Sequence, residues 1–184
     1  MKIKNLQITS ATLDLDLDLC KPVCVFRGQH SELVLDLVRE LIGDYGAEND
    51  PDRVDDGRFA INADIEMDGK SYAVCYIRNA DFMGDNRIAA NFVPGSLDYS
   101  KDDTVEFLEK CKARNNDLSN ILCGSVADLS REDDRPVFIY NADKMTSAGL
   151  ESLASSGRQV FIACSSSVLD IERESSQICL ADIG

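Results

Sequence analysis

The sequence has no apolar run that approaches the roughly 20 residues of a membrane-spanning helix. Its first residues, MKIKNLQITS, also lack the apolar stretch that characterises a secretory signal peptide. These two absences disfavour a membrane protein and a secreted one. We therefore expect a cytoplasmic protein that does not enter a membrane.

Cysteine and histidine, the residues of many metal and nucleophile sites, are scattered or scarce. The seven cysteines form no C-x-x-C pair and no zinc spacing, and most lie inside apolar runs, which is typical of reduced thiols in a core. His30 is the only histidine, so a Ser–His or Cys–His nucleophile would have to include it. We interpret His30 as a loop residue without a catalytic role, and we expect no bound metal.

Positive charge is also scarce, because 19 basic residues stand against 33 acidic ones and the net charge is −14. Such a surface repels phosphate backbones, which disfavours direct nucleic-acid binding. The simplest interpretation of the acidity is solubility. The alternative is an acidic face that docks a basic protein partner, with binding that weakens as salt is added.

The beginning of the chain predicts two half-buried strands, a fully buried strand and a buried helix. Residues 2–8 and 12–19 alternate between apolar and polar types, and the aspartates of the second segment form a solvated acidic face. Residues 22–26 (PVCVF) are a continuous apolar run, as in a strand buried on both faces. Residues 31–42 are apolar around most of a helix, so we expect this helix to be the most buried one.

The middle of the chain predicts an antiparallel sheet. Residues 59–67 and 70–78 alternate, and Asp68-Gly69 between them is the turn pair of a two-residue hairpin. Residues 87–93 extend the sheet by a third strand. We expect one domain over residues 1–184, with an antiparallel side sheet mainly from residues 1–19 and 58–93.

The last third alternates between strands and helices. We predict helices over residues 101–113 and 146–156, and strands over residues 136–140, 159–164 and 177–181. Strand–helix–strand order implies parallel pairing with right-handed crossovers. The sequence therefore predicts an α/β protein.

This order of elements resembles the ATPase head of ABC-type proteins, especially of the SMC and RecF kind. The closing residues 178–184 (ICLADIG) are similar to the usual ending of that family. The resemblance implies a three-layer P-loop NTPase-like fold, with a mainly parallel core sheet and an antiparallel side sheet. It also places residues 22–26 beside residues 159–164 or 136–140. An unrelated doubly wound domain with the same element order is the alternative.

The phosphate-binding loop of the family, G-x-x-x-x-G-K-[ST], is degenerate in this chain. Counted from Gly28, its last three positions hold Leu33, Val34 and Leu35. If Ser31 fills the hydroxyl position instead, the loop is four residues short. Either alignment loses the lysine that reaches the phosphates and the backbone wrap around them.

The other catalytic groups that the family implies are missing too. Tyr140 and Asn141 hold the expected positions of the acids for magnesium and the attacking water, and Asp143 is the one carboxylate nearby. Cys164 or Ser165 replaces the switch histidine, and no glycine-rich signature loop follows residues 129–130.

The resemblance and these losses together predict a pseudoenzyme. We expect a non-hydrolysing ATPase homologue that needs no cofactor and acts as a binding or regulatory module for a protein partner. Its vestigial phosphate loop, the first place to look for a small bound anion, contains Arg27, Gly28, Gln29, His30 and Ser31.

The alternative is an atypical NTPase that binds ATP and magnesium through a non-standard loop. Arg27 or Lys144 would then replace the missing lysine, and Asp143 would be the metal ligand. A protein-interaction domain that uses its acidic surface is a third possibility.

Overall fold

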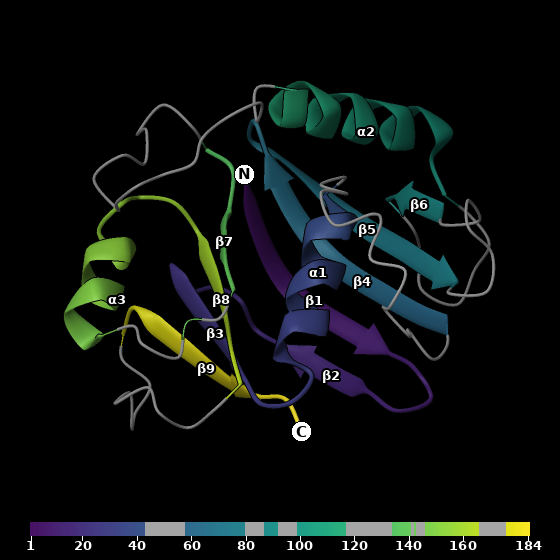
Figure 1. Cartoon of the computed structure of the whole chain (residues 1–184). Helices are drawn as coiled ribbons and strands as arrows, with labels where there is room; N and C mark the ends of the chain where they lie inside the picture. Colours follow the sequence, from purple (N-terminus) through teal and green to yellow (C-terminus); the bar gives the residue numbers. More distant parts are fainter. Residues whose placement is uncertain are drawn as a thin grey trace. The chain divides into compact units, whose positions relative to one another are not determined.

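The computed structural model describes residues 1–42, 58–79, 87–91, 99–116, 134–140, 142, 146–165 and 176–184 (Figure 1). Its contacts gather in two compact units. The first contains Met1–Lys2, Leu19–Val38 and Leu118–Gly184, and the second contains Ile3–Asp18 and Arg39–Asp117. The prediction of a single domain over residues 1–184 stays a prediction.

The first unit contains a four-stranded parallel sheet. Across the sheet, the strands are β7 (Val137–Ile139), β8 (Val160–Cys164), β3 (Val23–Arg27) and β9 (Ile178–Asp182). Strands β3 and β8 are buried almost throughout, as their continuous apolar runs predict. The predicted placement of residues 22–26 beside residues 159–164 is confirmed, because β3 pairs with β8 in parallel.

Helix α3 (Ser147–Ala154) links β7 to β8, in the predicted strand–helix–strand order. Thr146 begins it, since its hydroxyl oxygen accepts a hydrogen bond from the N–H of Gly149 at 3.2 Å. Leu150 and Leu153 are fully buried in one apolar cluster with side chains of β3 and β8. This cluster is the core on one face of the parallel sheet.

The second unit contains a five-stranded antiparallel sheet. Its order is β2 (Asp14–Leu17), β1 (Lys2–Thr9), β4 (Arg58–Met67), β5 (Lys70–Asn79) and β6 (Arg87–Ala90). The apolar residues of the alternating segments point to one face, where Leu6, Ile61 and Tyr72 are fully buried. The polar residues occupy the opposite face.

The predicted hairpin between β4 and β5 is confirmed. Met67 pairs with Lys70, so the loop consists of Asp68 and Gly69 alone. Both have positive φ angles, 51° and 75°. A two-residue turn that follows the twist of its strands requires this conformation, and Asp-Gly is a favoured pair for it.

The other two helices in the described part of the chain differ in how they are buried. Helix α1 (Ser31–Leu41) follows β3, and helix α2 (Lys101–Asn116) follows β6. Five side chains of α1 are completely inaccessible to solvent: Val34, Leu35, Leu37, Val38 and Leu41. Only a narrow stripe of α2, including Phe107 and Cys111, is buried. Among the described helices α1 is therefore the most buried, as predicted.

The predicted fold class, a three-layer P-loop NTPase-like domain on a mainly parallel core sheet, is wrong. The chain is a strand-rich α/β protein whose larger sheet is antiparallel, with five strands against four. Of the described helices only α3 joins two neighbouring parallel strands, whereas α1 leads from β3 to β4 and α2 from β6 to β7. The order of elements suggested one layered core, but order does not determine which sheet a strand joins.

Candidate functional site

The vestigial phosphate loop, residues 27–31, lies at the carboxyl end of β3, between the ends of β8 and β9. In open α/β sheets this edge is where ligands usually bind. The structure brings the loop together with Cys164 of β8 and with Asp182 and Ile183 at the end of β9. The contacts of these residues decide whether the loop has room for a phosphate.

Gly28 is required for close packing against the chain's own backbone. Its φ angle is +127°, a conformation that residues with a side chain rarely adopt. A Cβ atom placed on Gly28 would lie 2.0 Å from the carbonyl oxygen of Ile183. The segment after β9 therefore occupies the space beside Gly28, and the N–H of Ile183 donates to the carbonyl of Arg27 at 2.6 Å.

The polar groups of the loop bond to neighbouring strands rather than facing an open cradle. The N–H of Gly28 donates to the carbonyl oxygen of Cys164 at 3.0 Å. The hydroxyl of Ser31, which is 1% exposed, donates to the same carbonyl at 3.0 Å. A phosphate-binding loop needs such donors directed at the ligand. Here the carbonyl of Cys164 accepts both of them.

Arg27, the cation of the loop, pairs with a carboxylate on the next strand. Its Nε lies 2.6 Å from Oδ1 of Asp182, the residue opposite it in the β3–β9 register. This hydrogen bond raises the pKa of Arg27 and lowers the pKa of Asp182. Gln29 is exposed and His30 is half-buried, and the carbonyl of His30 accepts the N–H of Val34 in the first turn of α1.

The other predicted catalytic positions are described only in part. The hydroxyl of Tyr140, which directly follows β7, donates a hydrogen bond to Asp36 of α1, so this side chain links two segments of the first unit. Cys164 is buried, its thiol directed at the carbonyl of Phe26 at 3.7 Å, and Ser165 is exposed. Asn141, Asp143 and Lys144 lie outside the described residues, as do residues 129–130.

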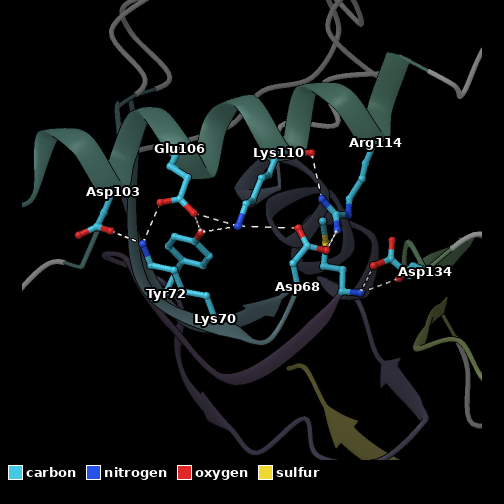
Figure 2. A network of polar contacts seen from close by, with 9 residues as sticks. Asp68, Lys70, Tyr72, Asp103, Glu106, Lys110, Arg114 and Asp134 are labelled. Carbon is cyan, nitrogen blue, oxygen red and sulfur yellow. Dashed lines mark hydrogen bonds and ion pairs between the residues drawn. The ribbon is translucent and has the colours of Figure 1, made fainter.

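A polar network that the sequence did not predict lies in the second unit (Figure 2). Four residues of α2 point toward the β4–β5 hairpin: Asp103, Glu106, Lys110 and Arg114. Lys70 Nζ contacts Asp103 and lies 2.9 Å from Glu106 Oε2. The hydroxyl of Tyr72 donates to Glu106 at 2.6 Å and accepts from Lys110 at 3.0 Å.

Two carboxylates of this network, Asp103 and Glu106, have lowered pKa values. Hydrogen bonds from Lys70, with Asn91 and Ser100 also contributing, lower the pKa of Asp103 to about 2. Hydrogen bonds from Tyr72, Lys70 and Lys110 lower the pKa of Glu106 to about 2. Both lysines have raised pKa values for the corresponding reason.

These protonation states suit a structural role rather than acid–base chemistry. A catalytic acid or base needs a pKa near the working pH, and the pKa values of Asp103, Glu106, Lys70 and Lys110 are all displaced away from neutrality. The signal in the sequence was the spacing of Asp103, Glu106 and Lys110, which puts them on one side of a helix. Their partners on the hairpin are distant in sequence, so the pairing itself was not predictable.

Comparisons with known proteins give no family. No protein-family model matches the chain, and no curated protein matches it. The resemblance to ABC-type ATPase heads therefore stays a prediction. Within the described ranges, no helix is long and apolar enough to span a membrane, and no group of three acidic, histidine or cysteine side chains is arranged to hold a metal ion.

Proposed function

We propose that this chain is a non-hydrolysing binding or regulatory module, a pseudoenzyme that acts through a protein partner. The observation that carries the proposal is the closure of residues 27–31. The backbone of Ile183 lies where a side chain on Gly28 would be, and Ser31 and Arg27 bond to neighbouring strands. A loop in this state presents neither the donors nor the cation that hold a nucleotide.

Arg27 is the residue that an atypical NTPase would need in place of the missing lysine. To reach a phosphate, its guanidinium would have to leave Asp182, whose carboxylate lies 2.6 Å away and would itself repel the phosphate. This arrangement supports the non-hydrolysing reading over the atypical NTPase. The net charge of −14 supports a protein partner over a nucleic acid.

Calorimetric titration of the full chain with ATP and magnesium tests the proposal. We expect no saturable heat up to about 1 mM nucleotide, which corresponds to a binding free energy weaker than about −4 kcal/mol. Phosphate release should stay at the level of buffer alone. Micromolar affinity would contradict the proposal, and loss of that affinity in Arg27→Gln would favour the atypical NTPase.

A further inference from the structure

A groove of about 400 Å³ crosses the polar face of the five-stranded sheet, over β2, β1, β4 and β5. Five polar side chains surround the groove, and the short side chain of Ala73 leaves space between them. We call it the sheet-face groove, and its residues are Asn5, Gln7, Asp16, Asn62, Ala63, Asp64, Ala73 and Val74. All eight belong to the second unit. Its volume is in the range of ordinary ligand sites.

The hollow has two causes in the local structure. Ala73 pairs with Asp64 across the hairpin, so a methyl group lies among longer side chains. Asn5 has a φ angle of +40°, and both Ile3 and Leu6 are fully buried. Strict alternation would place these two on opposite faces, so β1 departs from regular alternation at Asn5. The side chain of Asn5 reaches β4, where its Nδ2 donates to Asp64 Oδ2 at 3.2 Å.

The lining is rich in hydrogen-bond acceptors. Asp16 and Asp64 contribute carboxylates, three carboxamides contribute oxygens, and no lining residue is cationic. In the described part of the chain each carboxylate receives one side-chain bond, of 3.5 Å from Gln7 to Asp16 and of 3.2 Å from Asn5 to Asp64. Both bonds are exposed to solvent and the one to Asp16 is also long, so a better donor can displace them.

The chemistry of the lining selects a cationic ligand with several N–H donors. An anion would be repelled, and the described residues give no three-ligand arrangement for a metal ion. A guanidinium group has five N–H donors in a plane and binds carboxylates through paired hydrogen bonds. It is also less strongly hydrated than an ammonium group, so less hydration is lost when it enters a polar hollow.

The neighbouring edge of the sheet indicates what carries the guanidinium. Strand β2 is the outermost strand beside β1, and Asp14 and Asp16 alternate along its polar face, about 6.8 Å apart as in any strand. An extended segment with basic residues at every second position matches this spacing. A second copy of the chain does not, because edge-to-edge pairing would place aspartate opposite aspartate.

From these observations we infer that the sheet-face groove binds an arginine side chain of an extended basic segment in a partner protein. The inference rests on the proposed function, since it names the chemistry of the partner. It concerns a different part of the chain from residues 27–31, so each can fail without the other.

Fluorescence anisotropy of a labelled peptide tests the inference. The probe is a TRVRVRT peptide with blocked ends, and its control is the same peptide with citrulline in place of arginine, which keeps the shape and removes the charge. We expect the full chain to bind the arginine peptide at least about tenfold more tightly than the citrulline peptide, with affinity that falls as salt is raised. Equal binding of the two peptides, or no binding of either, would overturn the inference.

Three variants separate the groove from general attraction to an acidic protein. Ala73→Leu fills the hollow without changing charge, and Asp64→Asn removes one lining charge without changing shape. Asp102→Asn removes the same charge from an exposed position on α2. We expect the first two to weaken binding about tenfold or more and Asp102→Asn to change it less than about twofold. Equal losses in Asp64→Asn and Asp102→Asn, or full binding in Ala73→Leu, would also overturn it. Unchanged thermal unfolding confirms that the variants are folded.

Discussion

Residues 27–31 and the sheet-face groove show two opposite ways of using polar groups. In the loop, Ser31 and the N–H of Gly28 bond to the buried carbonyl of Cys164, and Arg27 pairs with Asp182. In the groove, carboxylates and carboxamides contact one another through solvent-exposed bonds around a hollow. A ligand site therefore needs donors and acceptors that remain accessible to a ligand. A sequence motif does not show whether they do.

A substitution in the closed loop, residues 27–31, should have the strongest effect on stability. Gly28→Ala introduces a Cβ 2.0 Å from a carbonyl oxygen at a φ angle of +127°. We expect it to lower the free energy of unfolding by roughly 3–5 kcal/mol in urea titrations, because strain and a backbone clash add.

Gly69→Ala is the matched control for this substitution. Gly69 also has a positive φ angle, of +75°, but nothing lies within 4 Å of its Cβ position. Only conformational strain remains there, which amounts to about 1–2 kcal/mol. If Gly28→Ala costs no more than Gly69→Ala, the loop is not closed against Ile183.

A second prediction concerns the buried side chains of helix α1. Leu37 of α1 is completely buried, so Leu37→Ala should lower the free energy of unfolding by about 2–5 kcal/mol, the range for truncations that leave a cavity. Val105 of α2 is 55% exposed, so Val105→Ala should change it by less than about 0.5 kcal/mol. Chemical denaturation of both variants measures the contrast. A loss below about 1 kcal/mol for Leu37→Ala would place α1 at the surface.

A third prediction concerns the pH dependence of stability at the β4–β5 hairpin, where polar groups bond to α2. The folded pKa values of Asp103 and Glu106, both about 2, lie below their ordinary values of 3.8 and 4.5. A lowered folded pKa contributes stability that is present above the ordinary value and is lost as the pH falls toward the folded value. The midpoint of urea unfolding should therefore decrease between about pH 4.5 and pH 2.

Glu106→Gln removes part of this pH dependence, whereas Asp102→Asn, at an exposed acid on the same helix, serves as its control. The first variant should show a shallower decline in stability over this pH window than the unmodified chain. Parallel declines in both variants would mean that the network does not hold α2 on the hairpin.

The smallest expected effect is in the groove. Asp64→Asn should change the free energy of unfolding by less than about 0.5 kcal/mol, because both Asp64 and its hydrogen bond from Asn5 are exposed to solvent. Thermal unfolding at neutral pH measures this. A large loss would mean that the groove side chains stabilise the sheet, which would remove their availability for a ligand.

Local structure could be predicted from the sequence far better than assembly. Three predicted features follow from local pattern and are present: the Asp68-Gly69 turn, the buried strand at residues 22–26 and the buried helix at residues 31–42. The division of strands between two sheets depends on long-range pairing, so the predicted fold class was wrong.

In the candidate site, too, local features were predictable from the sequence and long-range contacts were not. The loss of the phosphate-binding lysine is visible in the sequence, but the contact of Gly28 with Ile183 joins residues 155 positions apart. The predicted alternation of residues 2–8 is broken at Asn5, and the sequence holds a signal for this, because two polar residues, Lys4 and Asn5, separate Ile3 from Leu6.

Amide NMR spectra of the full chain map both regions at once, with ATP and magnesium added to one sample and the arginine peptide to another. We expect ATP at about 1 mM to leave the signals of residues 27–31 unchanged. The peptide should shift the signals of the groove residues, with Asn5, Asp16 and Asp64 among the largest shifts. Saturable shifts of Gly28 and Ser31 on addition of ATP, with the groove signals unmoved by the peptide, would show that residues 27–31 bind nucleotide and that the groove does not bind arginine.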